Sequence, residues 1–87
     1  MTEQTVAVTI RYFAAAAAAA GVDTETLDLA KDTTIATLVE RLSDRGGELT
    51  RVLKRCSYLC DGVAVRDMGK PVSTSQIIDV LPPFAGG

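Results

Sequence analysis

A nearly continuous apolar segment close to the end of the sequence, residues 76–81, limits the possible folds more than any other part of the chain. Its apolar side chains are interrupted only by Asp79. Such a run is typical of a strand that is covered on both faces and lies centrally in its sheet. Pro82 and Pro83 follow at once and end the strand, because proline has no N–H to donate to the ladder. We therefore expect the last strand of the chain to be a central one.

A second apolar strand is predicted near the start of the chain, where side chains alternate over residues 6–13. Alternation with period two indicates a strand with one face toward the core. The apolar face consists of Val6, Val8, Ile10 and Tyr12, and the opposite face of Ala7, Thr9, Arg11 and Phe13. No hairpin joins this strand to residues 76–81, yet both are strongly apolar, so adjacent central positions would bury the most surface.

The main helix is predicted at residues 35–42. Its apolar residues recur at the spacing of one helical face and are Ile35, Leu38, Val39 and Leu42. Thr33 or Thr34 can cap the start of this helix through a side-chain hydroxyl. Gly46 and Gly47 are expected to end it, since glycine commonly follows the last turn of a helix.

Shorter elements complete the predicted fold. The seven alanines at 14–20 favour a short helix that Gly21 can terminate, and residues 49–56 repeat helical spacing over a short stretch. Further strands are predicted at residues 24–29, 57–60 and 63–65, the last two as a hairpin around Asp61-Gly62. This order predicts an α+β roll, with four or five strands packed on one main helix and short additional helices.

Composition excludes several functional classes. The chain has 87 residues, which is enough for one domain, and a formal net charge of −2 without the basic patch that nucleic-acid binding requires. It has no histidine, the usual general base and metal ligand, and two cysteines cannot close a zinc site. We therefore expect no bound cofactor or metal and no catalytic residues of its own, which leaves enzyme status open.

The individual charged residues carry no catalytic pattern. The acidic residues Asp61, Asp67 and Asp79 have no spacing that marks a catalytic pair, so a solvated surface is the expected location of all three. The basic residues Arg11, Arg66 and Lys70 could meet an acidic partner or simply keep a face soluble.

The cysteines and the alanine run bear on cellular location. If Cys56 and Cys60 lie on one strand, their Cα atoms are about 13 Å apart, whereas a disulfide needs less than about 7 Å. Free thiols are typical of a cytoplasmic protein. The segment before the alanine run at 14–20 carries Glu3 and alternates like a strand, so the run is not interpreted as a signal peptide. No run approaches the ~18 apolar residues of a membrane span.

The final residues predict a reactive tail. We divide the chain into a folded domain, residues 1–81, and an extended tail, residues 82–87, with Gly-Gly at its end. Two prolines favour an extended path, and glycines without side chains can thread a narrow active site. The carboxylate of Gly87 would then be the substrate. An ionised carboxylate is a poor electrophile, so it needs activation, most simply adenylation by an ATP-using partner, before sulfur or an amine replaces AMP.

These residues resemble those of a known family, the small subunit of molybdopterin synthase together with the sulfur carriers of thiamine and cysteine biosynthesis. The matching features are Arg11-Tyr12-Phe13-Ala14, Gly21, the helix start Thr34-Ile35 with Leu38 and Leu42, the turn Asp61-Gly62, and the end Leu81-Pro82-Pro83-Phe84-Ala85-Gly86-Gly87. Two departures are Thr74-Ser75-Gln76, where an acidic turn is common, and the alanines of the first helix, which offer little for partner contacts.

The resemblance implies a ubiquitin-like β-grasp fold and a Gly87 thiocarboxylate made by an E1-like adenylating enzyme. For the molybdopterin branch it also implies a heterotetramer with the synthase large subunit and sulfur delivery to cyclic pyranopterin monophosphate (precursor Z). Three alternative functions are also consistent with the sequence. They are a carrier for thiamine or cysteine biosynthesis, a ubiquitin-like protein modifier, and an interaction module with an inert tail.

A partner surface is predicted around the tail. Ala85 and Gly86 are expected to thread the partner's active site together with Gly87. The expected interface residues are Phe84, Pro83, Pro82, Leu81, Phe13 and Ala64. If the first and last strands are parallel neighbours, Phe13 and Leu81 lie at the same end of the sheet. An apolar patch there would suit a partner, although both residues could equally be ordinary core.

Overall fold

The computed structural model describes residues 4–83, which form one five-stranded sheet with helices. In chain order the elements are β1 (Thr5–Tyr12), α1 (Ala15–Ala20), β2 (Thr24–Ala30), α2 (Ile35–Ser43), α3 (Gly47–Leu53), β3 (Ser57–Cys60), β4 (Val63–Ala64) and β5 (Ile77–Leu81). The strand order is β2-β1-β5-β3-β4. Strands β1 and β5 are parallel, and the other neighbours are antiparallel. The α+β prediction is confirmed.

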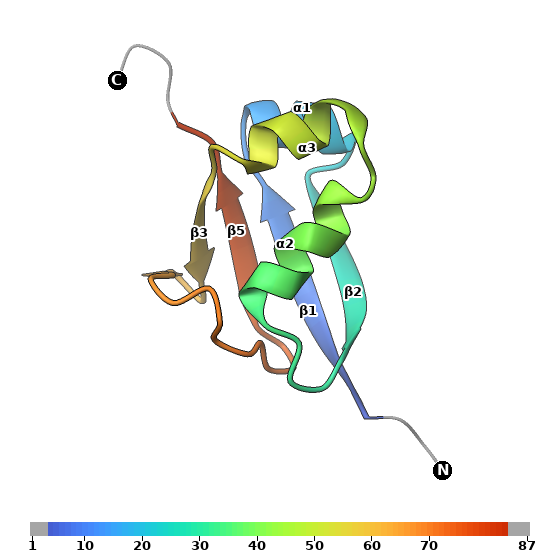
Figure 1. Cartoon of the computed structure of the whole chain (residues 1–87), viewed down its shortest axis with the longest axis vertical. Helices are drawn as coiled ribbons and strands as arrows, with labels where there is room; N and C mark the ends of the chain where they lie inside the picture. Colours follow the sequence, from blue (N-terminus) through green and yellow to red (C-terminus); the bar gives the residue numbers. More distant parts are fainter. Residues whose placement is uncertain (1–3, 84–87) are drawn as a thin grey trace.

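Strand β5 is the central strand, as the apolar segment predicts, and β1 lies beside it. The expectation that both faces of β5 are covered is wrong. Among the described residues the helices lie over one face of the sheet (Figure 1). Ile78 and Val80 point into the core under the helices, whereas Ile77 and Leu81 are only half-buried. We call the face of the sheet without helices the open face. Residues 77–81 form a nearly continuous apolar segment because Ile77 and Leu81, which lie on the open face, are apolar as well.

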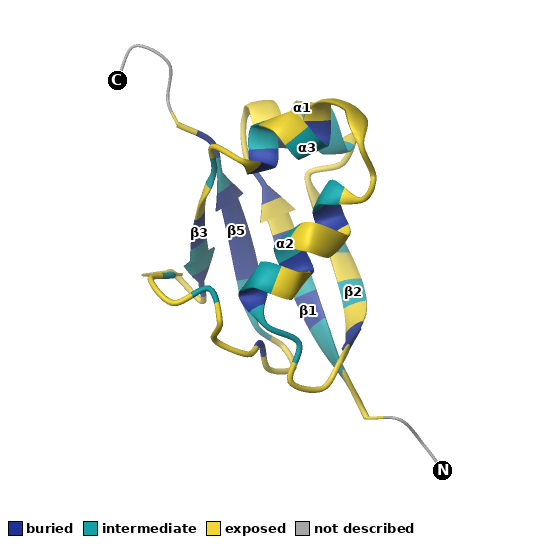
Figure 2. Cartoon of the chain, in the orientation of Figure 1, coloured by how far each residue is buried: buried dark blue, intermediate teal, exposed yellow. Residues whose placement is uncertain are grey.

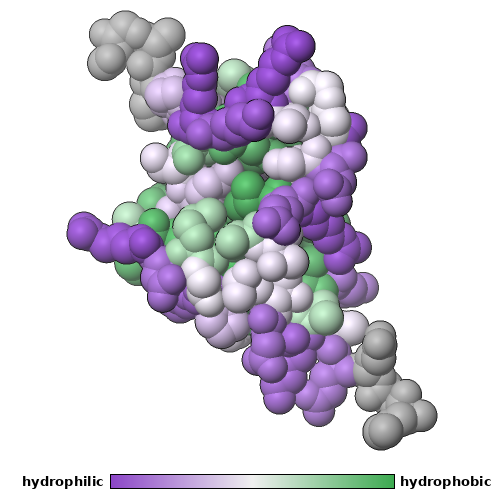
Figure 3. Space-filling model, in the orientation of Figure 1, coloured by the Kyte–Doolittle hydropathy of each residue, from purple (hydrophilic) through white to green (hydrophobic). Residues whose placement is uncertain are grey.

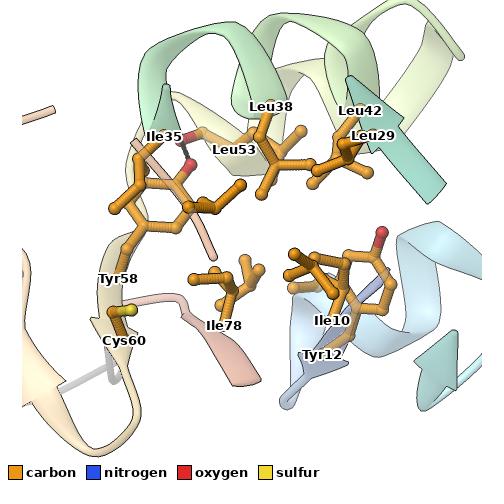
Figure 4. Close-up of a cluster of buried hydrophobic side chains, with 14 of the residues drawn as sticks. Ile10, Tyr12, Leu29, Ile35, Leu38, Leu42, Leu53, Tyr58, Cys60 and Ile78 are labelled. Carbon is orange, nitrogen blue, oxygen red and sulfur yellow. Dashed lines mark hydrogen bonds between the residues drawn. The ribbon is translucent and has the colours of Figure 1, made fainter. Parts of the chain in front are cut away.

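The core lies between the sheet and the helices. Alternate residues of β1, namely Val8, Ile10 and Tyr12, are buried, which produces the banded pattern along this strand in Figure 2. Figure 4 shows side chains of α2 and of the sheet pointing toward one another across this core. The buried residues of α2 are Ile35, Leu38 and Leu42, which confirms the helical face read from the sequence.

Helix α2 begins as predicted but ends differently. The Thr34 hydroxyl accepts a hydrogen bond from the Thr37 N–H at 3.2 Å, which makes Thr34 the N-cap. The prediction that Gly46 and Gly47 end this helix is wrong, because α2 already stops at Ser43. Gly46 has a φ of 75° and precedes α3. Its positive φ, which glycine adopts without steric cost, turns the chain into the next helix.

Helices α1 and α3 pack against each other at the end of the sheet toward which β1 and β5 point (Figure 1). The alanine run forms α1 as predicted, with Ala16 fully buried. Gly21 ends it in the left-handed region, with its N–H donating to the Ala17 carbonyl at 3.0 Å. This end of the sheet therefore carries two short helices and the end of the tail-bearing strand.

The predicted hairpin is present, with a shorter second strand. Asp61 and Gly62 have φ values of 50° and 83°, so both central positions of the turn are in the left-handed region as expected. Strand β4 comprises Val63 and Ala64 alone. Val65 lies beyond it, although its N–H still donates to the Tyr58 carbonyl at 2.9 Å.

Candidate partner-binding surface at the tail root

The tail root, residues 81–83, is where the chain leaves β5. Leu81 is half-buried, Pro82 is buried and Pro83 is exposed. Pro83 is thus the first exposed residue after the strand, and contact of Pro82 or Pro83 with a partner stays a prediction. The division into residues 1–81 and 82–87 remains a prediction. The predicted site residues Phe84, Ala85, Gly86 and Gly87 lie outside the described residues.

Phe13 lies beside the tail root. It follows β1 directly, and its N–H donates to the Val80 carbonyl at 3.2 Å. Because β1 and β5 are parallel neighbours, Phe13 and Leu81 lie at the same end of the sheet. Phe13 is 38% exposed, which is unusual for a large apolar side chain of this domain. The structure therefore brings together two of the predicted interface residues, and whether a partner covers them stays a prediction.

Strand pairing arranges a row of side chains across the open face. Arg11 pairs with Asp79, Asp79 with Leu59, and Leu59 with Ala64, so these four residues lie on four successive strands at one level. Leu81 lies two residues beyond Asp79 and therefore on the same face. Ala64, another predicted interface residue, is exposed on the edge strand β4. The row connects this edge to the strand that carries the tail.

Ala64 also borders a groove on the helix side of the molecule. Apolar side chains from α2, α3 and the β4–β5 loop contribute to its lining, namely Val39, Leu53 and Met68. Figure 3 shows this side, where an apolar area lies between hydrophilic side chains. Ala64 thus stands at the boundary of two surfaces, and its position alone does not favour either of them.

An ion pair occupies the middle of the open face. The Nε–H of Arg11 donates to Asp79 Oδ1 at 2.6 Å, and Nη2–H donates to Oδ2 at 2.9 Å, which is a bidentate arrangement. The Asp79 side chain is 7% exposed and that of Arg11 is 47% exposed. The hydrogen bonds to Asp79 raise the pKa of the Arg11 guanidinium above its usual value, so Arg11 is charged at every accessible pH. Its Cζ also lies 5.8 Å from the centre of the Phe13 ring, within cation–π range.

This ion pair was missed by sequence reasoning. Asp79 was expected on a solvated surface, and that expectation is wrong because neighbouring strands and Arg11 cover it. A signal was available in the sequence. An acidic residue inside an apolar central strand needs a cationic partner, and Arg11 is the cation on the adjacent strand whose side chain belongs to the same face. Asp61 and Asp67 are exposed as expected.

A second polar network joins β1, β2 and the residues after α2. The Tyr12 hydroxyl donates to Glu25 Oε2 at 2.6 Å, and Arg45 Nη2–H donates to Glu25 Oε1. The hydrogen bond from Arg45 is the main cause that lowers the pKa of the Glu25 carboxyl below its usual value. This network lies on the helix side and has a structural role, so it adds no reactive group to the open face.

The two thiols are not arranged for chemistry. Both cysteines are free, and Cys60 is buried while Cys56 is half-buried. Burial raises the pKa of both thiols, and the Cys56 Sγ–H donates to the Val52 carbonyl at 3.2 Å. A raised pKa disfavours the nucleophilic thiolate. The expectation of free rather than bridged cysteines is confirmed.

Two searches over residues 4–83 were negative. Within this range, no cluster of histidine, cysteine, aspartate or glutamate could hold a metal ion. No helix of the described part is long and apolar enough to cross a membrane.

Comparison with known proteins decides the family. A family model described as the ThiS family matches residues 10–87, which is most of the chain and includes the whole tail. The chain belongs to the ThiS family. A search among curated protein sequences gave no match.

Solved structures show the same fold as this ThiS family member. Small archaeal modifier protein 1 from Haloferax volcanii is 24% identical with a TM-score of 0.79, covering 93% of this chain and 99% of that chain. A putative molybdopterin converting factor subunit 1 from Pyrococcus furiosus is 22% identical with a TM-score of 0.81, covering 91% and 99%. One chain from a complex of subunits 1 and 2 of molybdopterin-converting factor from Helicobacter pylori 26695 is 20% identical with a TM-score of 0.70. The match covers 94% of this chain and 100% of that chain.

The β-grasp prediction is confirmed by the same kind of comparison. A ubiquitin from Caldiarchaeum subterraneum is 11% identical, yet its TM-score is 0.63 over 97% of this chain and all of that chain. Identity this low establishes the fold alone. The fold of this ThiS family member is therefore ubiquitin-like, and its biochemical role has to be argued from the tail root and the open face.

Proposed function

We propose that this protein is a cytoplasmic sulfur carrier that acts as the small subunit of molybdopterin synthase, with Gly87 as the residue that carries the sulfur. The proposal rests chiefly on one observation, the match of the ThiS family model through residue 87, which includes the Gly-Gly end. The tail root supports it, because the central strand β5 leads directly to Pro83, which is exposed.

The proposed chemistry takes place at the Gly87 carboxylate. On an E1-like enzyme the carboxylate attacks the α-phosphorus of ATP, pyrophosphate leaves, and an acyl-adenylate forms. A sulfur nucleophile, in the simplest case hydrosulfide, then attacks the acyl carbon and displaces AMP, which leaves a thiocarboxylate. Splitting a difficult substitution into two easier steps is the general advantage of such an activated acyl intermediate. The partner proteins supply the catalytic groups.

We place the sulfur acceptor in the molybdopterin branch. The Pyrococcus furiosus and Helicobacter pylori structures carry the name of molybdopterin converting factor, and the latter is a complex of subunits 1 and 2. By analogy, a large subunit would receive the tail and position precursor Z at the thiocarboxylate, within a heterotetramer. The open face, with Phe13 and Leu81 near the tail root, is the surface that we assign to this partner.

A protein modifier is the second candidate. The similar Haloferax volcanii structure is named a small archaeal modifier protein. The acyl-adenylate would then be attacked by an amine, and Gly87 would end in an isopeptide bond. A carrier for thiamine or cysteine biosynthesis uses the first route with another acceptor. All these functions need the same free C-terminal glycine, so an experiment must examine what becomes attached to it.

The deciding experiment is intact-mass analysis of the protein isolated from its own cells. A carrier shows a fraction that is heavier by the difference between sulfur and oxygen, and this fraction disappears on hydrolysis. Added purified large subunit and precursor Z should consume it and yield molybdopterin. Isopeptide-linked conjugates without a thiocarboxylate would overturn the carrier proposal. A thiocarboxylate consumed by a thiazole or cysteine synthase instead would overturn the branch assignment.

Two variants test the role of Gly87 itself. Removal of Gly87, or extension of the chain by one residue beyond it, should abolish thiocarboxylate formation while the far-UV CD spectrum and melting temperature stay unchanged. The matched control is a one-residue extension before Met1, because β1 begins at the opposite end of the sheet from the end of β5 (Figure 1). Full activity of the C-terminally extended protein would contradict every acyl-transfer function.

A further inference from the structure

We propose that Arg11 is a specificity-determining residue of the open face, which selects a protein partner that places an oxygen acceptor against its guanidinium. The inference rests on the proposed function, in that the partner is the large subunit that receives the tail. The argument begins with the pair at the middle of this face, Arg11 and Asp79. Neither residue belongs to the predicted interface or to the tail.

Asp79 fixes the position of the guanidinium. Its neighbours along β5, Ile78 and Val80, are buried in the core, so alternation directs Asp79 to the open face. A carboxylate at 7% exposure requires a hydrogen-bonded cation. Arg11, directly opposite on β1, supplies it through two bonds. Moving the guanidinium away would leave the buried Asp79 carboxylate without a cationic partner, which is energetically costly. The guanidinium is therefore held at this position on the open face.

The guanidinium keeps unused donors on its exposed side. The ion pair engages one N–H of Nε and one of Nη2, whereas an arginine carries further N–H groups on Nη1 and Nη2. Within residues 4–83 no second side chain accepts a hydrogen bond from Arg11. The side chain is 47% exposed, and its Cζ lies 5.8 Å from the centre of the Phe13 ring. Nearly half of the Arg11 side chain is thus open to contact in the free protein.

The surroundings make this cation decisive for binding. The open face next to the pair carries the partly buried apolar side chains of Ile77, Leu59 and Leu81. Leu81 is the last residue of β5, so a partner that takes up the following residues comes close to this face. Covering the apolar side chains also covers Arg11.

A purely apolar partner surface would leave the remaining N–H groups of Arg11 buried without acceptors, which opposes binding. A carboxylate or a carbonyl oxygen at this point would instead form charge-assisted hydrogen bonds. Asp79 is much less accessible to a partner, because its side chain is 7% exposed and each of its oxygens already accepts a hydrogen bond from Arg11. The pair therefore discriminates between partners through Arg11, and the apolar residues around it supply contact area.

The test is a binding measurement with the purified large subunit as the probe. The double variant Arg11→Leu/Asp79→Leu removes both charges at once. Replacement of a covered ion pair by apolar residues often leaves stability unchanged or improves it, so the variant is expected to fold. We expect its affinity for the large subunit to fall by about tenfold or more, because the partner's acceptor loses its donors. Arg41→Leu, an exposed cation on α2, is the matched control and should bind like the wild type.

The outcomes separate the two proposals. Wild-type protein that does not bind the large subunit overturns the proposed function and this inference with it. Wild-type binding that the leucine pair retains or improves overturns the inference alone. If the leucine pair does not fold, Arg11→Lys takes its place, since lysine keeps the charge beside Asp79 but lacks the planar fork of donors. Unchanged affinity of a folded Arg11→Lys variant would equally overturn the inference.

Discussion

Asp61 and Ile77 are joined by two hydrogen bonds that run in opposite directions. The Ile77 N–H donates to Asp61 Oδ1 at 2.9 Å, and the Asp61 N–H donates to the Ile77 carbonyl at 2.8 Å. Asp61 is the first turn residue of the β3–β4 hairpin, and Ile77 is the first residue of β5. The turn therefore fixes the point at which the tail-bearing strand enters the sheet.

Asp61→Ala should lower the free energy of unfolding by about 1–2 kcal/mol. The substitution removes the acceptor of the Ile77 N–H, and it places alanine at a φ of 50°, which favours asparagine, aspartate or glycine. Urea unfolding followed by CD measures the change. Asp61→Asn is the control, because its amide oxygen can still accept the bond and it tolerates this φ. An alanine variant as stable as the asparagine variant would contradict the role given to this side chain.

Tyr58→Phe should lower the free energy of unfolding at pH 7 by about 1–3 kcal/mol. The buried hydroxyl donates to the Leu53 carbonyl at 2.9 Å, and that carbonyl loses its side-chain donor in the variant. Chemical unfolding at pH 7 measures the loss. Retention of wild-type stability would show that this hydrogen bond contributes nothing at neutral pH.

The same variant should change the response to alkali. Burial raises the pKa of Tyr58 to about 12, from an ordinary value of 10.0. A raised folded-state pKa stabilises the fold fully below pH 10, and this contribution is lost as the pH rises toward 12. The wild type should therefore lose stability more steeply over this window than Tyr58→Phe. Parallel curves for the two proteins would contradict the raised pKa.

Glu25→Gln should lower stability at neutral pH by on the order of 1–2 kcal/mol, because charge-assisted bonds from Tyr12 and Arg45 become weaker. The pKa of Glu25 is lowered, so its contribution is present above the usual value of 4.5 and is lost as the pH falls through the lower folded value. The difference between wild type and variant should accordingly shrink below pH 4.5.

The control for this substitution is Glu48→Gln. Glu48 and its partner Arg51 are 62% and 83% exposed, at a separation of 3.5 Å. Exposed pairs of this kind contribute little, so the change should stay within about 0.5 kcal/mol. Equal losses in the Glu25 and Glu48 variants would contradict the distinction between the partly buried and the exposed pair. Urea titrations at several pH values provide both comparisons.

Thr34→Ala should destabilise the protein by about 1 kcal/mol. The hydroxyl accepts the Thr37 N–H, one of the amides at the start of α2 that have no partner within the helix. Thr34→Ser keeps the hydroxyl and should retain most of the stability. Thermal unfolding of the two variants side by side measures the difference, and equal melting temperatures would show that the cap is not energetically important.

Much of the fold followed from local patterns in the sequence. The alternation of Val8, Ile10 and Tyr12 and the helical spacing of Ile35, Leu38 and Leu42 each describe one buried face, and burial of such a face is the strongest constraint on a small domain. The end of α2 could not be predicted in this way. The glycines after it serve the start of α3, and sequence alone does not distinguish these two uses.

The site was only partly predictable for a related reason. The position of Phe13 beside Leu81 followed once β1 and β5 were taken as parallel neighbours. The role of Arg11 did not follow, because its partner Asp79 lies 68 positions away along the chain. An acidic residue inside an apolar central strand indicates that a cation lies nearby, but only the register between β1 and β5 identifies that cation as Arg11.

The central position of β5 has a mechanical consequence. A partner that pulls on the tail applies force along the axis of this strand, which is held by β1 on one side and β3 on the other. The bonds to the antiparallel neighbour run across the strand direction, so a pull along the strand loads them in shear and together. An edge strand such as β4 has one neighbour instead of two, so fewer hydrogen bonds would share the same load. The tail thus continues from a strand that is hydrogen-bonded to a neighbour on each side, and both neighbours share a load applied to it.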